Sequence, residues 1–155
     1  MVSPQSFSEK EAYDFAARYC SGQERCKAEV VQKLKSFDVS EDIINQIIEK
    51  LCQEKYLDDK RFAKAFVHDK LRFNKWGRIK LSMALRQKGV EESVANAALK
   101  EIDQNEYLDI LKEELDKKAK FVKGANKEVT KKLFQFALSR GFESYVIQDV
   151  LSMED

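Results

Sequence analysis

The chain has 155 residues, of which 43% are hydrophobic and 35% charged, with 28 Lys or Arg against 27 Asp or Glu. This hydrophobic fraction supports a packed core and excludes a disordered chain. One proline and five glycines disfavour strand-rich folds with many tight turns, whereas the abundant Ala, Leu, Lys, Glu and Gln favour helix. The composition therefore predicts an all-α protein.

The sequence also disfavours membrane, secretory and metal-binding classes. No apolar run approaches the roughly 18 to 20 residues that a membrane helix needs, and the N-terminal segment lacks the apolar core of a secretory signal. Cys20, Cys26 and Cys52 form no CxxC pair, and the only histidine, His68, lies apart from them. We expect buried thiols, no metal, no cofactor and a cytoplasmic location.

The first predicted repeat covers residues 8–57. Ser8 followed by Glu11 is a capping-box pattern that predicts a helix start, and Ser40 is positioned to cap a later helix over residues 43–51. Asp38 stands between the second and third predicted helices, where a left-handed residue is expected. These signals predict three short helices.

The same pattern of apolar residues recurs twice more along the chain. At an offset of 51, eight apolar positions within residues 27–52 fall on apolar positions within 78–103. At a further offset of 52, nine positions match. One of them is Gly89, which falls on Gly141, each at the expected end of a second helix. Asp58 is positioned to cap the helix that opens the middle repeat. We therefore predict an elongated, curved array of three tandem three-helix repeats, covering residues 8–57, 58–104 and 105–153.

Positive charge is concentrated in the middle repeat. Residues 60–90 contain ten Lys or Arg and one carboxylate, Asp69, a net charge of +9, whereas residues 1–59 and 91–155 are each net −4. A mixture of charges that serves only solubility would be interspersed. The segregation predicts a surface that binds an acidic partner.

The first helix of the middle repeat divides into two faces when residues are spaced at about 100°. Its predicted core face contains Phe62, Ala65, Phe66 and Phe73, and Asp69 falls on this face, either at its edge or paired with a cation. The opposite side forms a basic stripe of Arg61, Lys64, His68, Arg72 and Lys75. Because the stripe lacks the carboxylates that a solvated face normally supplies, we favour a partner-binding role.

The turn after this helix places further candidates beside the stripe. Trp76 acts either as a structural wedge between helices or as a stacking platform, and Gly77 permits a close approach. Arg78 and Lys80 open the next helix. Arg86 and Lys88 lie near its end, where cations also suit the helix dipole.

A secondary basic cluster lies in the third repeat, diluted by Glu113, Glu114, Asp116 and Glu128. An exposed helix pair and a binding surface are equally good interpretations of this cluster. If the repeats stack so that it adjoins the middle repeat, both clusters would line one groove. Its members are Lys117, Lys118, Lys120, Lys123, Lys127, Lys131 and Lys132.

Three segments of the middle repeat resemble the signature of the RecX family of bacterial regulatory proteins. They are Tyr56-Leu57-Asp58-Asp59-Lys60-Arg61-Phe62-Ala63, Trp76-Gly77-Arg78-Ile79-Lys80 and Leu85-Arg86-Gln87-Lys88-Gly89-Val90. The resemblance extends over residues 8–152 through the repeat pattern. It departs at Arg78, where many relatives have proline after the turn glycine.

The resemblance implies a non-enzymatic modulator of the RecA recombinase in DNA repair and recombination. We separately expect a monomer. Such a protein binds in the groove of RecA filaments on single-stranded DNA and restrains filament growth, ATP hydrolysis, strand exchange and co-protease activity. The alternative is direct binding of DNA phosphates, single- or double-stranded, by the basic middle repeat in a helix-turn-helix manner. An enzyme is disfavoured, because the sequence has no phosphate-binding glycine loop and no catalytic triad spacing.

Overall fold

Nine helices follow one another along residues 7–153, the part of the chain that this computed structural model describes. No strand interrupts them within that range, which confirms the predicted all-α class. Residues 1–6, which belong to the N-terminal segment without a secretory core, lie outside it. The helices are α1 (Glu9–Gly22), α2 (Lys27–Lys35), α3 (Glu41–Gln53), α4 (Asp59–Asn74), α5 (Arg78–Gln87), α6 (Glu92–Lys100), α7 (Gln104–Ala119), α8 (Asn126–Ser139) and α9 (Ser144–Met153).

The predicted helix starts are confirmed by their side-chain hydrogen bonds. The Ser8 Oγ accepts from the Glu11 backbone N–H at 3.1 Å, and the Glu11 carboxylate accepts from the Ser8 N–H, which completes the capping box. Asp58 Oδ1 accepts from the N–H groups of the first turn of α4, and Ser40 caps α3. These bonds satisfy N–H groups that have no partner within a helix.

The predicted helix ends are confirmed as well. Gly89 and Gly141 have φ values of 79° and 93°, and Asp38 has a φ of 60°, so all three occupy the left-handed region. Lys55 and Lys75, which were not predicted to be left-handed, also lie there. Each of these residues reverses the chain after a helix.

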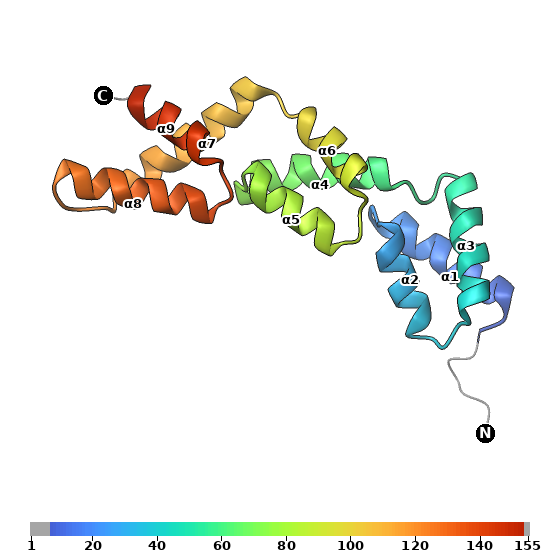
Figure 1. Ribbon diagram of the computed structural model, residues 1–155. Coiled ribbons are helices and arrows are strands. Elements are labelled where there is room, and N and C mark those ends of the chain that lie inside the picture. The colour runs from blue at the N-terminus through green and yellow to red at the C-terminus, as the bar shows by residue number, and fades with distance from the viewer. Residues whose placement is uncertain (1–6, 154–155) are drawn as a thin grey trace.

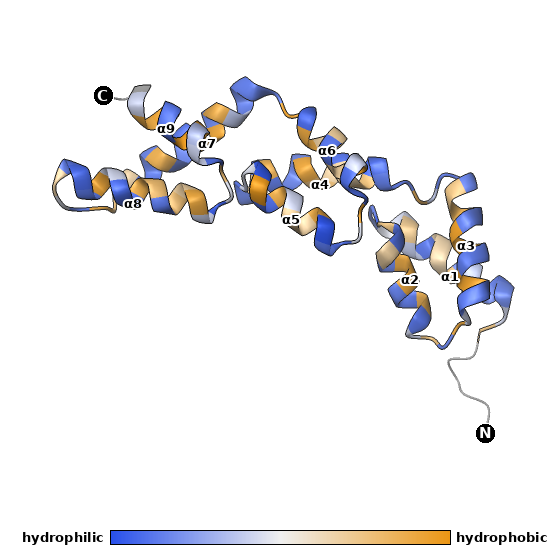
Figure 2. Cartoon of the chain, in the orientation of Figure 1, coloured by the Kyte–Doolittle hydropathy of each residue, from blue (hydrophilic) through white to orange (hydrophobic). Residues whose placement is uncertain are grey.

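The helices form three units in a row, α1–α3, α4–α6 and α7–α9 (Figure 1). Orange and blue residues alternate along every helix in Figure 2, as expected of helices that bury one side. The first unit has its own core, whereas the middle and third units share one. Cys26 is the exception, because this fully buried residue of the first unit belongs to the core of the middle unit.

The core face of α4 differs from the predicted one. Phe62, Ala63, Val67 and Leu71 are buried, whereas Phe73 is 79% exposed. Ala65 and Phe66 are only half-buried. The predicted core face was centred on the aromatic rings of α4. In the structure α4 packs mainly against α6, and this contact buries the side of α4 that carries Ala63, Val67 and Leu71.

Adjacent units are joined through their second helices, and the same joint occurs twice. At the first joint, the Cys26 thiol before α2 donates to the Lys88 carbonyl at the end of α5, at 3.4 Å. At the second joint, the Gly77 N–H before α5 donates to the Arg140 carbonyl at the end of α8, at 2.7 Å. The repeat alignment places Cys26 on Gly77 and Lys88 on Arg140. The helices α8, α5 and α2 therefore follow one another head to tail along the row (Figure 1).

The second joint requires two glycines. A Cβ atom on Gly77 would clash with the nitrogen of Phe142 and lie 2.5 Å from the carbonyl carbon and oxygen of Gly141. A Cβ atom on Gly141 would lie 2.6 Å from the backbone nitrogen of Lys80. The Ile79 N–H also donates to the Gly141 carbonyl at 2.9 Å. The close approach predicted for Gly77 is thus a backbone contact between two units.

Candidate partner-binding surface of the middle unit

Several cations of the predicted surface form ion pairs with carboxylates that lie outside their own helix. Arg61 Nε lies 2.8 Å from Glu24 Oε1, and its guanidinium also donates to the carbonyls of Lys55 and Tyr56. These partners all precede α4. Arg61 therefore fastens the start of α4 to the end of the first unit.

Arg72 performs a similar task on the other side of the middle unit. Its guanidinium makes two hydrogen bonds to the Glu106 carboxylate of α7, at 2.6 and 3.1 Å. The hydrogen bond raises the pKa of Arg72 and lowers that of Glu106. Because the pair is solvent-exposed, it fixes geometry more than it adds stability.

Two further lysines of the predicted surface are paired. Lys64 Nζ lies 3.4 Å from Glu101 at the end of α6, and Lys88 Nζ lies 3.5 Å from Glu29 of α2. The stripe has no carboxylate of its own on α4, as the sequence indicated, but Arg61, Lys64 and Arg72 are nevertheless paired. The partners come from distant parts of the sequence and not from the same helix, so a count along one helix cannot reveal them.

Arg78 lies at the centre of the second joint. Its guanidinium contacts Glu143 at 2.9 Å and Gln104 at 2.6 Å, and stacks over the Tyr107 ring at 4.0 Å. Its backbone N–H donates to the Tyr107 hydroxyl at 2.9 Å, and this hydroxyl in turn donates to Glu143. Burial, and then the bond to Glu143, raises the pKa of Tyr107. We interpret Arg78 as a residue that holds the joint.

Lys75, Lys80 and Arg86 form no ion pair within residues 7–153. His68 contacts its neighbour Asp69 at 3.2 Å, and both side chains are more than half exposed. Asp69 thus lies at the edge of the core face of α4, next to the His68 imidazole. The unpaired cations of the predicted surface thus lie in the α4–α5 turn and on α5.

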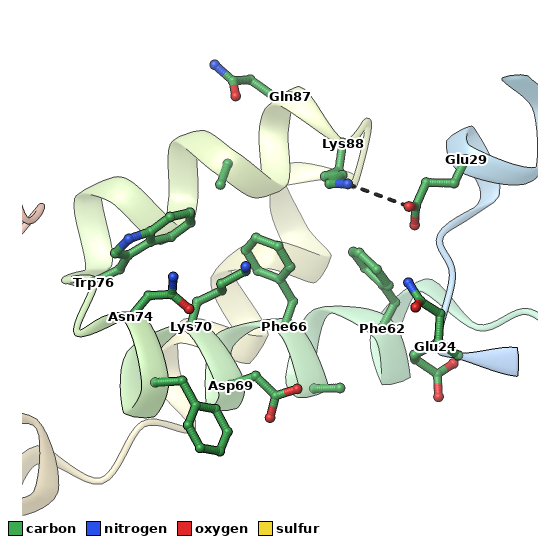
Figure 3. Close-up of a pocket in the computed structure, with 14 residues that line it drawn as sticks. Glu24, Glu29, Phe62, Phe66, Asp69, Lys70, Asn74, Trp76, Gln87 and Lys88 are labelled. Atoms are coloured by element: carbon green, nitrogen blue, oxygen red, sulfur yellow. Dashed lines mark ion pairs between the residues drawn. The ribbon is translucent and has the colours of Figure 1, made fainter.

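A groove of about 880 Å³ lies between α4 and α5 and extends to the first unit (Figure 3). Its floor carries Phe62, Phe66 and Trp76, with ring centroids 5.8 Å apart for the first pair and 6.4 Å for the second. Lys70 lies along this row of rings in Figure 3, 5.3 Å from the Trp76 centroid. Trp76 is therefore a wedge against Phe66 and also part of an open groove.

The sequence reasoning missed this groove. Phe62, Phe66 and Lys70 recur every fourth residue, a spacing that places them in one line along α4. This spacing could have identified the groove if the rings had not been assigned to the core. The rim is mixed in charge, because Glu24, Glu29 and Asp69 lie there with Lys70 and Lys88.

The secondary basic cluster lies at the end of α7, in the α7–α8 connection and on α8. None of its seven lysines forms an ion pair with another described residue. Figure 1 shows the α7–α8 connection at the end of the row, away from the middle unit. The cluster as a whole therefore does not line the groove between α4 and α5.

The described residues provide neither a metal-ligand cluster nor a helix able to span a membrane. No group of three or more His, Cys, Asp or Glu side chains converges within residues 7–153. The helices in this range are too short or too polar to cross a bilayer.

Models of three successive domains of one family match the chain. The RecX first three-helix domain matches residues 12–51, the second matches 58–99 and the third matches 105–151. The chain belongs to the RecX family. The resemblance to the RecX family and the predicted array of three-helix repeats are both confirmed.

Named RecX proteins and RecX crystal structures resemble the chain over most of its length. "Regulatory protein RecX" of Chlorobium phaeobacteroides strain BS1 is 34% identical over 92% of this chain and 93% of the relative. The protein of the same name from Prosthecochloris aestuarii is also 34% identical, over 92% of both. The crystal structure of RecX from Lactobacillus salivarius has a TM-score of 0.88 and 26% identity, over 94% of this chain and 95% of that one.

Proposed function

We propose that this chain regulates the RecA recombinase by binding RecA filaments on single-stranded DNA. In this role it restrains filament growth, ATP hydrolysis, strand exchange and co-protease activity, as a cytoplasmic protein without catalytic activity of its own. The observation that carries the proposal is the match of all three units to RecX domains, whose relatives are named regulatory proteins.

The groove between α4 and α5 supports a protein partner. Its aromatic floor offers apolar surface, and its rim combines Asp69 and Glu24 with Lys70, Asn74 and amide side chains. A rim of mixed charge suits a polypeptide that carries both acidic and basic side chains. Phe73, at the edge of this groove, is 79% exposed and supplies an apolar anchor.

The cations of the middle unit then take two roles. We assign Lys75, Lys80 and Arg86, with Trp76, to contact with the filament. Arg61, Lys64, Arg72, Arg78 and Lys88 instead hold neighbouring helices in place, and His68 lies beside them on the outer side of α4. This division favours the filament over a helix-turn-helix mode, because the first turn of α5 is covered by the third unit.

The test compares two single substitutions at exposed rings. Phe73→Ser removes the anchor beside the groove, whereas Phe121→Ser removes an 82% exposed ring at the far end of the third unit. RecA-dependent ATP hydrolysis on single-stranded DNA is measured against increasing amounts of each protein. We expect Phe73→Ser to require about tenfold more protein for half inhibition, the scale of an interface anchor, and Phe121→Ser to match the unsubstituted chain.

The outcomes separate function from site. A chain that leaves RecA-dependent hydrolysis unchanged would contradict the regulatory role itself. If Phe73→Ser inhibits as strongly as the unsubstituted chain, the groove is not the binding site, although the regulatory role is unaffected.

A further inference from the structure

Cations and aromatic rings alternate along the third unit toward the second joint. Lys118 Nζ, at the end of α7, lies 5.2 Å from the centroid of the Phe136 ring on α8. The Arg140 guanidinium lies 5.1 Å from the same centroid. Arg140 is the last residue before the glycine turn between α8 and α9, so this row ends at the middle unit.

The row continues across the joint. The Arg140 carbonyl accepts from Gly77, the residue that follows Trp76, and Gly141 lies against the backbone of Lys80. The Lys80 ammonium lies 4.8 Å from the Trp76 centroid, and the Lys70 ammonium lies 5.3 Å from it. We call this set the cation–aromatic track, and its members are Lys118, Phe136, Arg140, Lys80, Trp76 and Lys70.

The four cations of the track are available to a ligand. None of them forms an ion pair with a carboxylate between residues 7 and 153, in contrast to Arg61, Arg72 and Arg78. Among the described contacts, only cation–π interactions hold them, and such interactions are weak at exposed sites. Stacking of a base on an aromatic ring is stronger than an exposed cation–π contact, so a nucleic acid can displace these contacts.

We propose that the cation–aromatic track binds single-stranded nucleic acid directly, across the joint between the middle and third units. Trp76 and Phe136 stack on unpaired bases, and Lys70, Lys80, Lys118 and Arg140 neutralise the phosphates between them. A duplex hides the faces of its bases and cannot use the rings. The backbone contact of Gly77 with Arg140 fixes the distance between the two halves of the track.

This inference goes beyond the proposed function, because it requires no RecA. It also moves the nucleic-acid contact away from the basic stripe of α4, whose cations are largely engaged at joints. The alternation of rings and cations separates this surface from a purely electrostatic one, which would bind any polyanion equally well.

Trp76 is the only tryptophan of the chain and reports binding at the centre of the track. The experiment titrates the full-length chain with a dT oligonucleotide and follows tryptophan fluorescence across a salt series. The track variant combines Lys80→Gln, Lys118→Gln and Arg140→Gln. The control variant combines Lys10→Gln, Lys100→Gln and Lys112→Gln, which are exposed lysines outside the track and give the same change in net charge.

We expect the oligonucleotide to quench Trp76 in the unsubstituted chain and in the control. The track variant should bind about tenfold or more weakly, and its log–log salt slope should fall by about 2, for three lost phosphate contacts at roughly 0.7 each. Phe136→Leu, which keeps apolar packing but removes the ring, should weaken binding with an unchanged salt slope. Helical circular dichroism confirms that each variant is folded.

Four results would overturn the inference. They are equal affinities of the track and control variants, binding without a change in Trp76 fluorescence, equal binding of duplex DNA or inorganic polyphosphate, and binding to anionic vesicles in preference to dT. Inhibition of RecA-dependent ATP hydrolysis is measured in parallel with the same proteins. If the chain inhibits RecA-dependent ATP hydrolysis but does not bind the oligonucleotide, only the cation–aromatic track is rejected. If it binds the oligonucleotide but does not inhibit hydrolysis, only the regulatory role is rejected.

Discussion

Tyr107 shows how one side chain connects the middle and third units. Its ring is fully buried against Phe142, with centroids 5.2 Å apart, and its hydroxyl bridges the Arg78 N–H and the Glu143 carboxylate. Glu143 is only 15% exposed, and Arg78 and Tyr107 supply hydrogen bonds to its carboxylate. The bridge satisfies a helix N-terminus and a carboxylate in a place that water reaches poorly.

This burial predicts a loss of stability at alkaline pH. The pKa of Tyr107 is raised in the folded chain above its ordinary value of 10.0, so the unfolded chain loses this proton first. The contribution is fully present below pH 10 and is lost as the pH rises toward the folded value, at up to about 1.4 kcal/mol per pH unit. Urea unfolding of Tyr107→Phe should show about 1 to 3 kcal/mol lower stability at neutral pH but a smaller alkaline loss.

Tyr145→Phe serves as the control for this measurement, because its side chain is 61% exposed. It should follow the unsubstituted chain at each pH. An alkaline loss of the same size in Tyr107→Phe and in the unsubstituted chain would show that another group governs the titration.

Single residues with a local physical role were predictable from the sequence. Ser8, Ser40 and Asp58 cap helices through atoms two or three residues away, and Gly89 turns the chain at a helix end. Arg78 was not predictable in this way. Its partners Gln104 and Glu143 lie 26 and 65 residues further along the chain, so only the folded array reveals its role.

At the scale of elements, the joint between α5 and the α8–α9 turn is the tightest contact between units. A side chain at residue 77 would meet backbone on the opposite side, which cannot rotate away. We expect Gly77→Ala to destabilise the chain by about 1 to 3 kcal/mol or more, the usual cost of overpacking. Urea unfolding gives the change, with the midpoint and slope fitted separately.

Gly22→Ala is the matched control for Gly77→Ala. A Cβ atom at Gly22 has no heavy atom within 4 Å, and the residue lies in the last turn of α1. Because alanine favours helix over glycine, this change should raise stability by up to about 1 kcal/mol. Equal effects of the two substitutions would mean that the joint adapts to a larger residue.

The helices themselves were predictable, but the side that each one buries was not always so. Apolar spacing at every third or fourth residue, together with the matched offsets, was sufficient to identify three-helix units. The predicted core face of α4 was correct for Phe62, which is buried, but wrong for Phe66, which is half-buried in a groove, and for Phe73, which is exposed. An aromatic residue fits a core, a groove or an anchor equally well, and only the neighbouring helices decide among them.

At the scale of the whole molecule, the row of units ends in a modified helix. Val30, Leu81 and Leu133 occupy equivalent positions in the repeat alignment. Leu133 lies one turn further from the start of its helix than the other two do, so α8 begins one turn earlier than α2 and α5. At the position that corresponds to Gly77, the Val129 N–H is already bonded within α8, to Ala125 at 3.0 Å. The site that would receive another unit is therefore filled.

This filled site predicts a monomer. A second copy that docked the end of its α2 on the start of α8 would form a head-to-tail interface, which propagates into fibres unless it closes. Sedimentation from micromolar to near-millimolar concentration should give the mass of one chain, 18.0 kDa, throughout. A mass that grows with concentration would show that the extra turn does not block this contact.

The middle unit, in contrast, carries both halves of the joint. It offers the Lys88 carbonyl to the unit before it and the Gly77 N–H to the unit after it. A duplicated copy of residues 58–104, the range that we propose for this unit, would find a partner at each end if it were inserted in tandem. Lengthening of such a protein by gene duplication is therefore open at its middle unit.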